Sequence, residues 1–243
     1  MVGGNEKMRD KIKDENYFKA LVEKEEKNII MFENAVKKSI VEKGESDRGT
    51  RNGFRILINS YQNEINLLYS YGEDLEIIEE QYKKLLSYYG KMWDRKYGYI
   101  EMIKVLALAV LFEVDKGEIY SLEERIIYEN LDDYLANILI GVIDSAWTKK
   151  GTEFEFKGVY DCLRPILDNK EDNSSELIKE YLQKKWYDIH KECTWYDSHR
   201  SSQNIYYGYW SFEAGAIAKI LNIDDSNLKD EPYYPYDLVH YKN

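Results

Sequence analysis

Proline and glycine are scarce in this chain. Three prolines and 14 glycines among 243 residues are too few for a loop-rich protein or for an all-β fold, which needs frequent turns. Apolar residues recur instead at three- and four-residue spacing along most of the chain, which is the period of amphipathic helices. The sequence therefore predicts an all-α fold.

Cysteines and long apolar runs are also lacking. The two cysteines, Cys162 and Cys193, cannot form a disulfide framework. The N-terminus has no apolar core of a signal peptide. The most apolar run, residues 105–112, is too short to span a bilayer and is bordered by Lys104 and Glu113. We therefore expect a soluble cytoplasmic protein that does not bind membranes.

Acidic residues outnumber basic ones. With 45 Asp and Glu against 34 Lys and Arg, the formal net charge is −11. Phosphate backbones repel such a chain, so we expect no direct binding of nucleic acid. The same charge attracts a basic partner, such as a DNA-cleaving enzyme. The 23 tyrosines offer stiff contact area with a polar tip, although biased codon usage explains them equally well.

The helical pattern divides the chain into two halves. Amphipathic segments surround residues 100–114, which are apolar almost all round and are expected to form a buried helix. The pattern breaks at residues 115–120, and we place a domain boundary there, near Gly117. The sequence thus predicts two packed helical domains, at 8–117 and 118–243.

The stretch from Tyr206 to Tyr241 organises the second half. It includes a helix rich in small residues, which neighbouring elements can approach closely, so we place this helix centrally. Glu213 lies within the apolar part, where an unpaired carboxylate is unfavourable, and we expect it to pair with His199 or Arg200. The residues to which we assign structural roles are Trp210, Glu213, Asp224, Pro235 and Asp237.

Three short motifs follow one another in this stretch. They are Gly-Tyr-Trp-Ser-Phe-Glu-Ala from Gly208, Ile-Asp-Asp-Ser from Ile223 and Tyr-Tyr-Pro-Tyr-Asp-Leu from Tyr233. In this order and spacing they resemble the C-terminal domain of the PoNi family. These are immunity proteins that neutralise PoNe-type DNase toxins of bacterial polymorphic toxin systems. The helical pattern of the first half is similar to the N-terminal domain of the same family.

The resemblance implies that the chain works by binding. A cognate toxin is the implied partner, and occluding the toxin's basic DNA-binding or active-site surface would suffice. The resemblance implies no catalysis, no cofactor and no bound metal for this chain. It leaves the oligomeric state open.

Two acidic surfaces are candidates for binding the toxin, because carboxylates steer a basic partner and tyrosines supply anchor area. The first candidate surface comprises Asp225, Asp230, Glu231, Tyr233 and Tyr234. The second comprises Glu73, Asp74, Glu76 and Glu80. For each surface, a solvated segment that folds on its own domain is the alternative interpretation.

Enzyme function is the rival hypothesis. One version is a metal-dependent or cysteine-dependent hydrolase that uses His190, Cys193 and His199, with Cys162 approaching them. The paired spacing that fixes a zinc site is missing from this set. A second version uses Glu213, Asp224 and Asp225 for acid–base chemistry, although helix caps employ the same residue types. A helical adaptor for another cytoplasmic partner is a third possibility.

Overall fold

The computed structural model describes residues 7–96, 98–168 and 173–242. Within these residues the secondary structure consists of helices and turns without a strand, so the predicted all-α fold is confirmed. The chain forms two compact units. Unit 1 comprises Met1–Met92 and Asp197–Tyr209, and unit 2 comprises Trp93–Tyr196 and Trp210–Asn243.

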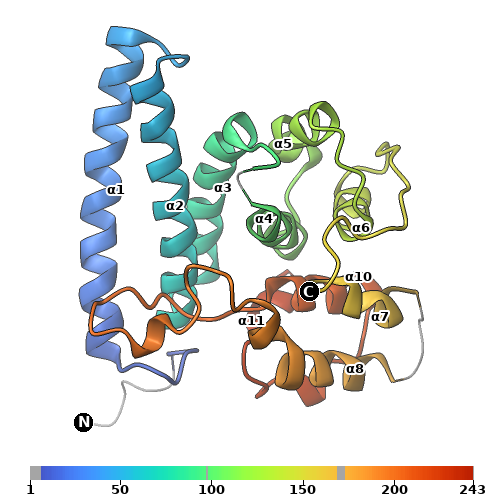
Figure 1. Ribbon diagram of the computed structural model, residues 1–243. Coiled ribbons are helices and arrows are strands. Elements are labelled where there is room, and N and C mark those ends of the chain that lie inside the picture. Colours follow the sequence, from blue (N-terminus) through green and yellow to red (C-terminus); the bar gives the residue numbers. More distant parts are fainter. Residues whose placement is uncertain (1–6, 97, 169–172, 243) are drawn as a thin grey trace. The chain divides into compact units, whose positions relative to one another are not determined.

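Unit 1 is built on the long helices α1 (Glu15–Lys43), α2 (Arg48–Tyr71) and α3 (Leu75–Met92). The first two helices each begin after an aspartate, Asp14 and Asp47, whose carboxylate accepts hydrogen bonds from N–H groups of the first turn. Helix α2 packs against both α1 and α3 (Figure 1). The core of unit 1 therefore lies along the length of α2.

A segment from the second half of the sequence completes unit 1. The chain leaves unit 2 after Tyr196 and returns to it at Trp210. Between them, the Tyr206 backbone N–H donates to Tyr17 Oη at 3.0 Å, and Tyr206 Oη donates to the buried carboxylate of Asp10 at 2.5 Å. The compact units therefore do not coincide with the two halves of the sequence.

Unit 2 consists of shorter helices. They are α4 (Tyr99–Leu111), α5 (Lys116–Tyr128), α6 (Tyr134–Ile143), α7 (Arg164–Asp168), α8 (Ser174–Tyr181), α9 (Tyr187–Ile189), α10 (Phe212–Leu221) and α11 (Tyr236–Val239), with 3-10 turns at Asp161–Leu163 and Ser226–Leu228 and a π-helical turn at Leu182–Trp186.

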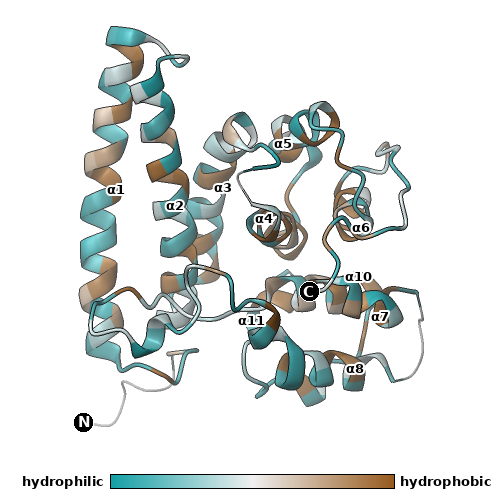
Figure 2. Ribbon diagram, viewed as in Figure 1, coloured by the Kyte–Doolittle hydropathy of each residue, from teal (hydrophilic) through white to brown (hydrophobic). Residues whose placement is uncertain are grey.

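Helix α4 lies at the centre of unit 2. It is hydrophobic around its circumference (Figure 2) and packs against α6 and α10, which confirms the buried helix predicted for this region. The small residues of α10 permit close approach, as expected: a Cβ added to Gly215 would lie 2.7 Å from Pro235. None of the helices in the described ranges combines the length and apolarity needed to cross a bilayer.

The predicted break at residues 115–120 is misplaced: the chain leaves helical structure between Leu111 and Lys116. Asp115 and Glu118 form a capping box, which starts α5 at Lys116. Gly117 therefore lies in the first turn of a helix. The division of the sequence into domains at 8–117 and 118–243 remains a prediction.

Gly72 offers a test of the packing at the end of α2. Its backbone is left-handed, with φ 89° and ψ 27°, and an added Cβ would lie 1.8 Å from the carbonyl oxygen of Lys7. We expect Gly72→Ala to lower the free energy of unfolding by about 3 kcal/mol, because backbone strain and steric overlap add. Urea unfolding followed by circular dichroism measures the change.

The matched control for this variant is Gly141→Ala, within α6. Apart from the backbone of its own helix, no atom of the described residues lies within 4 Å of the Cβ position at Gly141, so the higher helix propensity of alanine should raise the free energy of unfolding by roughly 0.5–1 kcal/mol. Changes of the same sign and size at both positions would contradict the close approach at Gly72.

Candidate functional site

Glu213 lies in the first turn of α10 and is buried, with 3% of its surface exposed. Its Oε1 atom accepts hydrogen bonds from Tyr181 Oη at 2.9 Å, Trp186 Nε1 at 2.7 Å and Ser211 Oγ at 2.6 Å. We call Tyr181, Trp186, Ser211 and Glu213 the Glu213 network. Hydrogen bonds to a charged acceptor are stronger than those between neutral groups, so the network ties α8, the π-helical turn and α10 together.

The expected ion pair of Glu213 with His199 or Arg200 is wrong. His199 Nδ1 is hydrogen-bonded to Tyr209 Oη at 2.9 Å, and Arg200 pairs with Asp197 at 3.1 Å. Glu213 is satisfied by neutral donors instead. This sequence contains many tyrosine, tryptophan and serine side chains that can donate a hydrogen bond, besides its cations. The type of partner that Glu213 finds could therefore not be chosen from the sequence.

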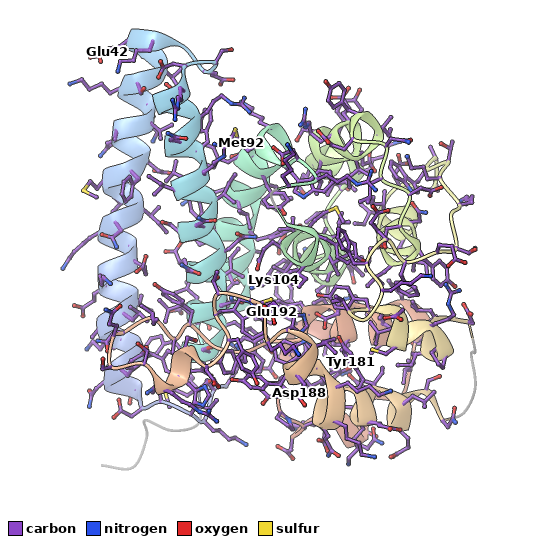
Figure 3. The ribbon with its side chains drawn as sticks, viewed as in Figure 1. Glu42, Met92, Lys104, Tyr181, Asp188 and Glu192 are labelled. Atoms are coloured by element: carbon purple, nitrogen blue, oxygen red, sulfur yellow. The ribbon has the colours of Figure 1, made fainter. Side chains whose placement is uncertain are left out.

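Lys104 of α4 adds a positive charge near the network, and Figure 3 labels it together with Tyr181. Burial lowers the pKa of the Lys104 ammonium group, while the negative charges of Glu101 and Glu213 act in the opposite direction. The Lys104 Nζ atom lies 5.7 Å from the ring centroid of Phe212. The carboxylate of Glu213 is therefore stabilised by direct hydrogen bonds and by the field of a neighbouring cation.

The π-helical turn between α8 and α9 sets the geometry of the network. Tyr181 and Trp186 are five residues apart, and i→i+5 bonding brings residues at that spacing toward one side of the helix. In a regular α-helix the same two side chains would point about 140° apart. The turn thus allows both donors to reach one carboxylate oxygen, and the spacing of apolar residues gave no sign of it.

Aromatic rings cover the network. The ring of Trp186 lies 4.6 Å from that of Tyr233 and 5.6 Å from that of Trp195, and Tyr233 also stacks on Tyr187 at 6.0 Å. Tyr233 has a φ of 69°, and its carbonyl oxygen accepts from the Ser211 N–H at 2.8 Å. The half-buried Tyr233 therefore connects the network to the surface of unit 2.

His190, a candidate ligand or base, is engaged at both ring nitrogens. Its Nδ1 lies 2.6 Å from the carbonyl oxygen of Trp186, and its Nε2 lies 3.3 Å from Tyr160 Oη. The side chain is buried, with 2% exposed. Because a carbonyl oxygen can only accept, Nδ1 donates to it, and Nε2 is hydrogen-bonded to the Tyr160 hydroxyl. These contacts give His190 a structural role.

The two thiols have shifted acidity. Burial raises the pKa of Cys162 and of Cys193 to about 11. A nucleophilic or metal-binding cysteine needs the opposite shift, toward the thiolate. Within the described ranges, no three His, Cys, Asp or Glu side chains are placed to hold a metal ion.

Two members of the first candidate surface are not on the surface. Asp225 and Tyr234 are buried, with 4% and 3% exposed, which corrects the expectation that both face a partner. Asp225 accepts from Tyr234 Oη at 2.7 Å and pairs with His240 Nε2 at 2.9 Å. Asp225 thus holds the C-terminal segment on unit 2.

The other members of that surface differ in accessibility. Asp230 is exposed and Tyr233 is half-buried. Glu231 pairs with Lys179 at 2.9 Å and accepts from Gln183 at 2.7 Å. The candidate surface is therefore reduced to these three residues.

The second candidate surface begins α3. Asp74, Glu76 and Glu80 are exposed, and Glu73 is half-buried in the turn before the helix. Asp74 forms an exposed ion pair with Lys7 at 3.7 Å. Carboxylates in the first turn of a helix also favour its N-terminus, so their presence has a structural reason beside any binding role.

The remaining residues with expected structural roles occupy varied places. Asp224 accepts from the N–H of Ser226, the first residue of the 3-10 turn, at 3.1 Å. Trp210 is half-buried and precedes α10, and Pro235 is buried. Helix α11 begins directly after Pro235, so Asp237 lies inside its first turn rather than at its cap.

Comparison with known proteins identifies two matching family descriptions. The family of PoNe immunity proteins (PoNi), N-terminal, matches residues 9–124, and the corresponding C-terminal family matches residues 131–238. A comparison with curated proteins found no match.

A solved structure shares the fold. The crystal structure of protein PA2201 from Pseudomonas aeruginosa superposes with a TM-score of 0.67, covering 91% of this chain and 87% of that chain at 16% identity. At this identity the likeness concerns the fold alone.

The Glu213 network can be tested by removing its acceptor. We expect Glu213→Ala to lower the free energy of unfolding by about 3–5 kcal/mol, because three buried donors lose their partner. Glu213→Gln retains an acceptor oxygen and should cost only about 1–2 kcal/mol. Urea unfolding followed by tryptophan fluorescence compares the two, and equal losses would show that the hydrogen bonds contribute little.

Proposed function

This chain belongs to the family of PoNe immunity proteins, and from this premise we propose that it binds a cognate PoNe-type toxin and neutralises it. The observation that carries the proposal is the match of both family halves, at residues 9–124 and 131–238. The toxin is proposed to be a DNase, and its inhibition is proposed to occur in the cytoplasm, where the DNA of a bacterium lies.

The charge of the chain supports this proposal. An enzyme that cuts DNA needs a basic surface to hold the phosphate backbone. A partner with a net charge of −11 is attracted to such a surface and competes for it with DNA. Inhibition by occlusion requires no chemistry from the immunity protein, which is consistent with the structural roles of His190 and Glu213.

We propose two contact surfaces for the toxin. The first comprises Asp230, Glu231 and Tyr233, of which Tyr233 supplies aromatic contact area. The second is the acidic start of α3, with Glu73, Asp74, Glu76 and Glu80. Asp225 and Tyr234 contribute by holding the first surface in place.

Inhibition is tested with the purified nuclease domain of the proposed cognate PoNe-type toxin. We expect the purified chain to stop cleavage of plasmid DNA at one equivalent per nuclease. The association rate should fall as salt rises from about 50 to about 500 mM, because ions screen the attraction. The proposed function would be overturned if the nuclease cleaved all the plasmid in the presence of excess chain and no binding were detected.

The α3 surface has its own test. The double variant Glu76→Lys, Glu80→Lys should slow association about tenfold. The double variant Glu42→Lys, Glu45→Lys changes the net charge by the same amount at exposed positions beside the α1–α2 connection and should have a smaller effect. Equal slowing by both pairs would show that only the total charge matters, and would remove the α3 surface.

A further inference from the structure

A group of carboxylates lies between the helices of unit 1. Glu25, Glu26 and Glu33 come from α1, and Glu64 comes from α2. All three α1 carboxylates lie close enough to Glu64 to raise its pKa. We call these four residues the α1–α2 carboxylate cluster.

Glu64 lies at the base of this cluster and is 4% exposed. Among the described residues, no group donates a hydrogen bond to its Oε2 atom. Burial, followed by the three neighbouring carboxylates, raises the pKa of Glu64 to about 7, and Lys84 of α3 acts in the opposite direction. Lys84 is itself exposed and donates to Gln81 at 3.2 Å.

Other groups satisfy the outer members of the cluster. Glu33 accepts from Tyr61 Oη at 2.6 Å and pairs with Lys37 at 3.5 Å. Glu25 pairs with Lys24 at 3.9 Å. Glu64 therefore differs from Glu25 and Glu33, because its buried Oε2 atom has no donor among the described residues.

A purely structural role does not explain this position. A buried carboxylate oxygen without a partner is unfavourable, and glutamine or leucine would fill the same space without a charge. Glu213 in unit 2 shows the contrast, since its buried oxygen accepts three hydrogen bonds. At Glu64 the three neighbouring carboxylates add to this cost, and a cation supplied by a partner would relieve it.

An exposed apolar side chain lies beside the cluster. Ile30 of α1 is 59% exposed. Ile30 lies four residues after Glu26 and three before Glu33, so these three side chains share one face of the helix. An apolar side chain next to a carboxylate suits the side chain of lysine or arginine, which combines an apolar stem with a charged head.

We propose that the α1–α2 carboxylate cluster receives a lysine or arginine side chain of the cognate toxin, with Ile30 packing against the apolar stem of that side chain. The incoming cation passes the exposed Glu26 and lies over Glu64. This inference rests on the proposed function and adds a contact surface on α1 and α2 to those given above.

Binding at this site is linked to a proton. In the free protein Glu64 is largely protonated below pH 7, and a bound cation stabilises its ionised form. Binding therefore releases a proton near neutral pH. The affinity for the toxin should rise about tenfold between pH 6 and pH 8 through this group.

The test uses Glu64→Gln in the full chain, with the nuclease domain of the proposed cognate PoNe-type toxin as the probe. We expect Glu64→Gln to weaken binding about tenfold or more at pH 8 and to abolish the part of the pH dependence that Glu64 causes. Isothermal titration calorimetry in buffers of different ionisation enthalpy measures affinity and proton release together.

The same variant should be more stable than the parent. A carboxyl group whose pKa is raised by folding stabilises the protein fully only below the unfolded pKa of about 4.5, and this contribution is lost as pH rises toward 7. Glu64→Gln has no carboxyl group to ionise and so avoids this loss of stability. Its melting temperature at pH 8 should be roughly 4 °C higher than that of the parent.

Glu123→Gln is the matched control. Glu123 of α5 is 6% exposed, its Oε1 atom has no partner among the described residues, and its pKa is also raised to about 7. Glu123→Gln should raise the melting temperature in the same way and leave binding of the nuclease unchanged. Ile30→Ala, at an exposed position, should weaken binding about threefold without unfolding the chain.

The outcomes separate the two proposals. If the parent chain does not bind the nuclease at all, the proposed function fails. If the parent binds and Glu64→Gln binds equally well with the same proton release, the cluster is no contact and this inference fails. Equal losses of affinity in Glu64→Gln and Glu123→Gln would also overturn it, because the effect would then not be local to the cluster.

Discussion

A buried charge must find donors, and this constraint accounts for much of the structure of unit 2. Glu213 would destabilise α10 if its carboxylate were left alone. The π-helical turn brings Tyr181 and Trp186 to the same oxygen, and Ser211 adds a third donor from the residue before the helix. Rings then cover these donors and exclude water, which strengthens the hydrogen bonds beneath them.

Glu64 and Glu123 do not satisfy the same constraint. Each is buried with an oxygen that lacks a partner among the described residues, and each has a pKa of about 7. Natural proteins tolerate such unfavourable positions most readily where function requires them. The neighbours distinguish the two positions: Glu64 lies among carboxylates beside the exposed Ile30, whereas Glu123 has Lys116 and Asp144 nearby.

For an immunity protein, affinity for the toxin is the property on which selection acts, and stability is needed only above a threshold. An acidic surface speeds encounter, and a few desolvated contacts decide how long the complex lasts. The exposed carboxylates at the start of α3 suit the first task. The α1–α2 carboxylate cluster, with the exposed Ile30 beside it, suits the second task, which is to prolong the complex.

The sequence alone determined the all-α fold, the buried helix at residues 100–114 and the family, because helical periodicity and short motifs are local properties of the chain. It also indicated that Glu213 needs a partner. Only the tertiary structure decided that this partner is a set of neutral donors, that Asp225 and Tyr234 are buried, and that residues 197–209 complete unit 1. These features depend on side chains that are distant in sequence, and their pairing follows from packing in three dimensions rather than from any spacing along the chain.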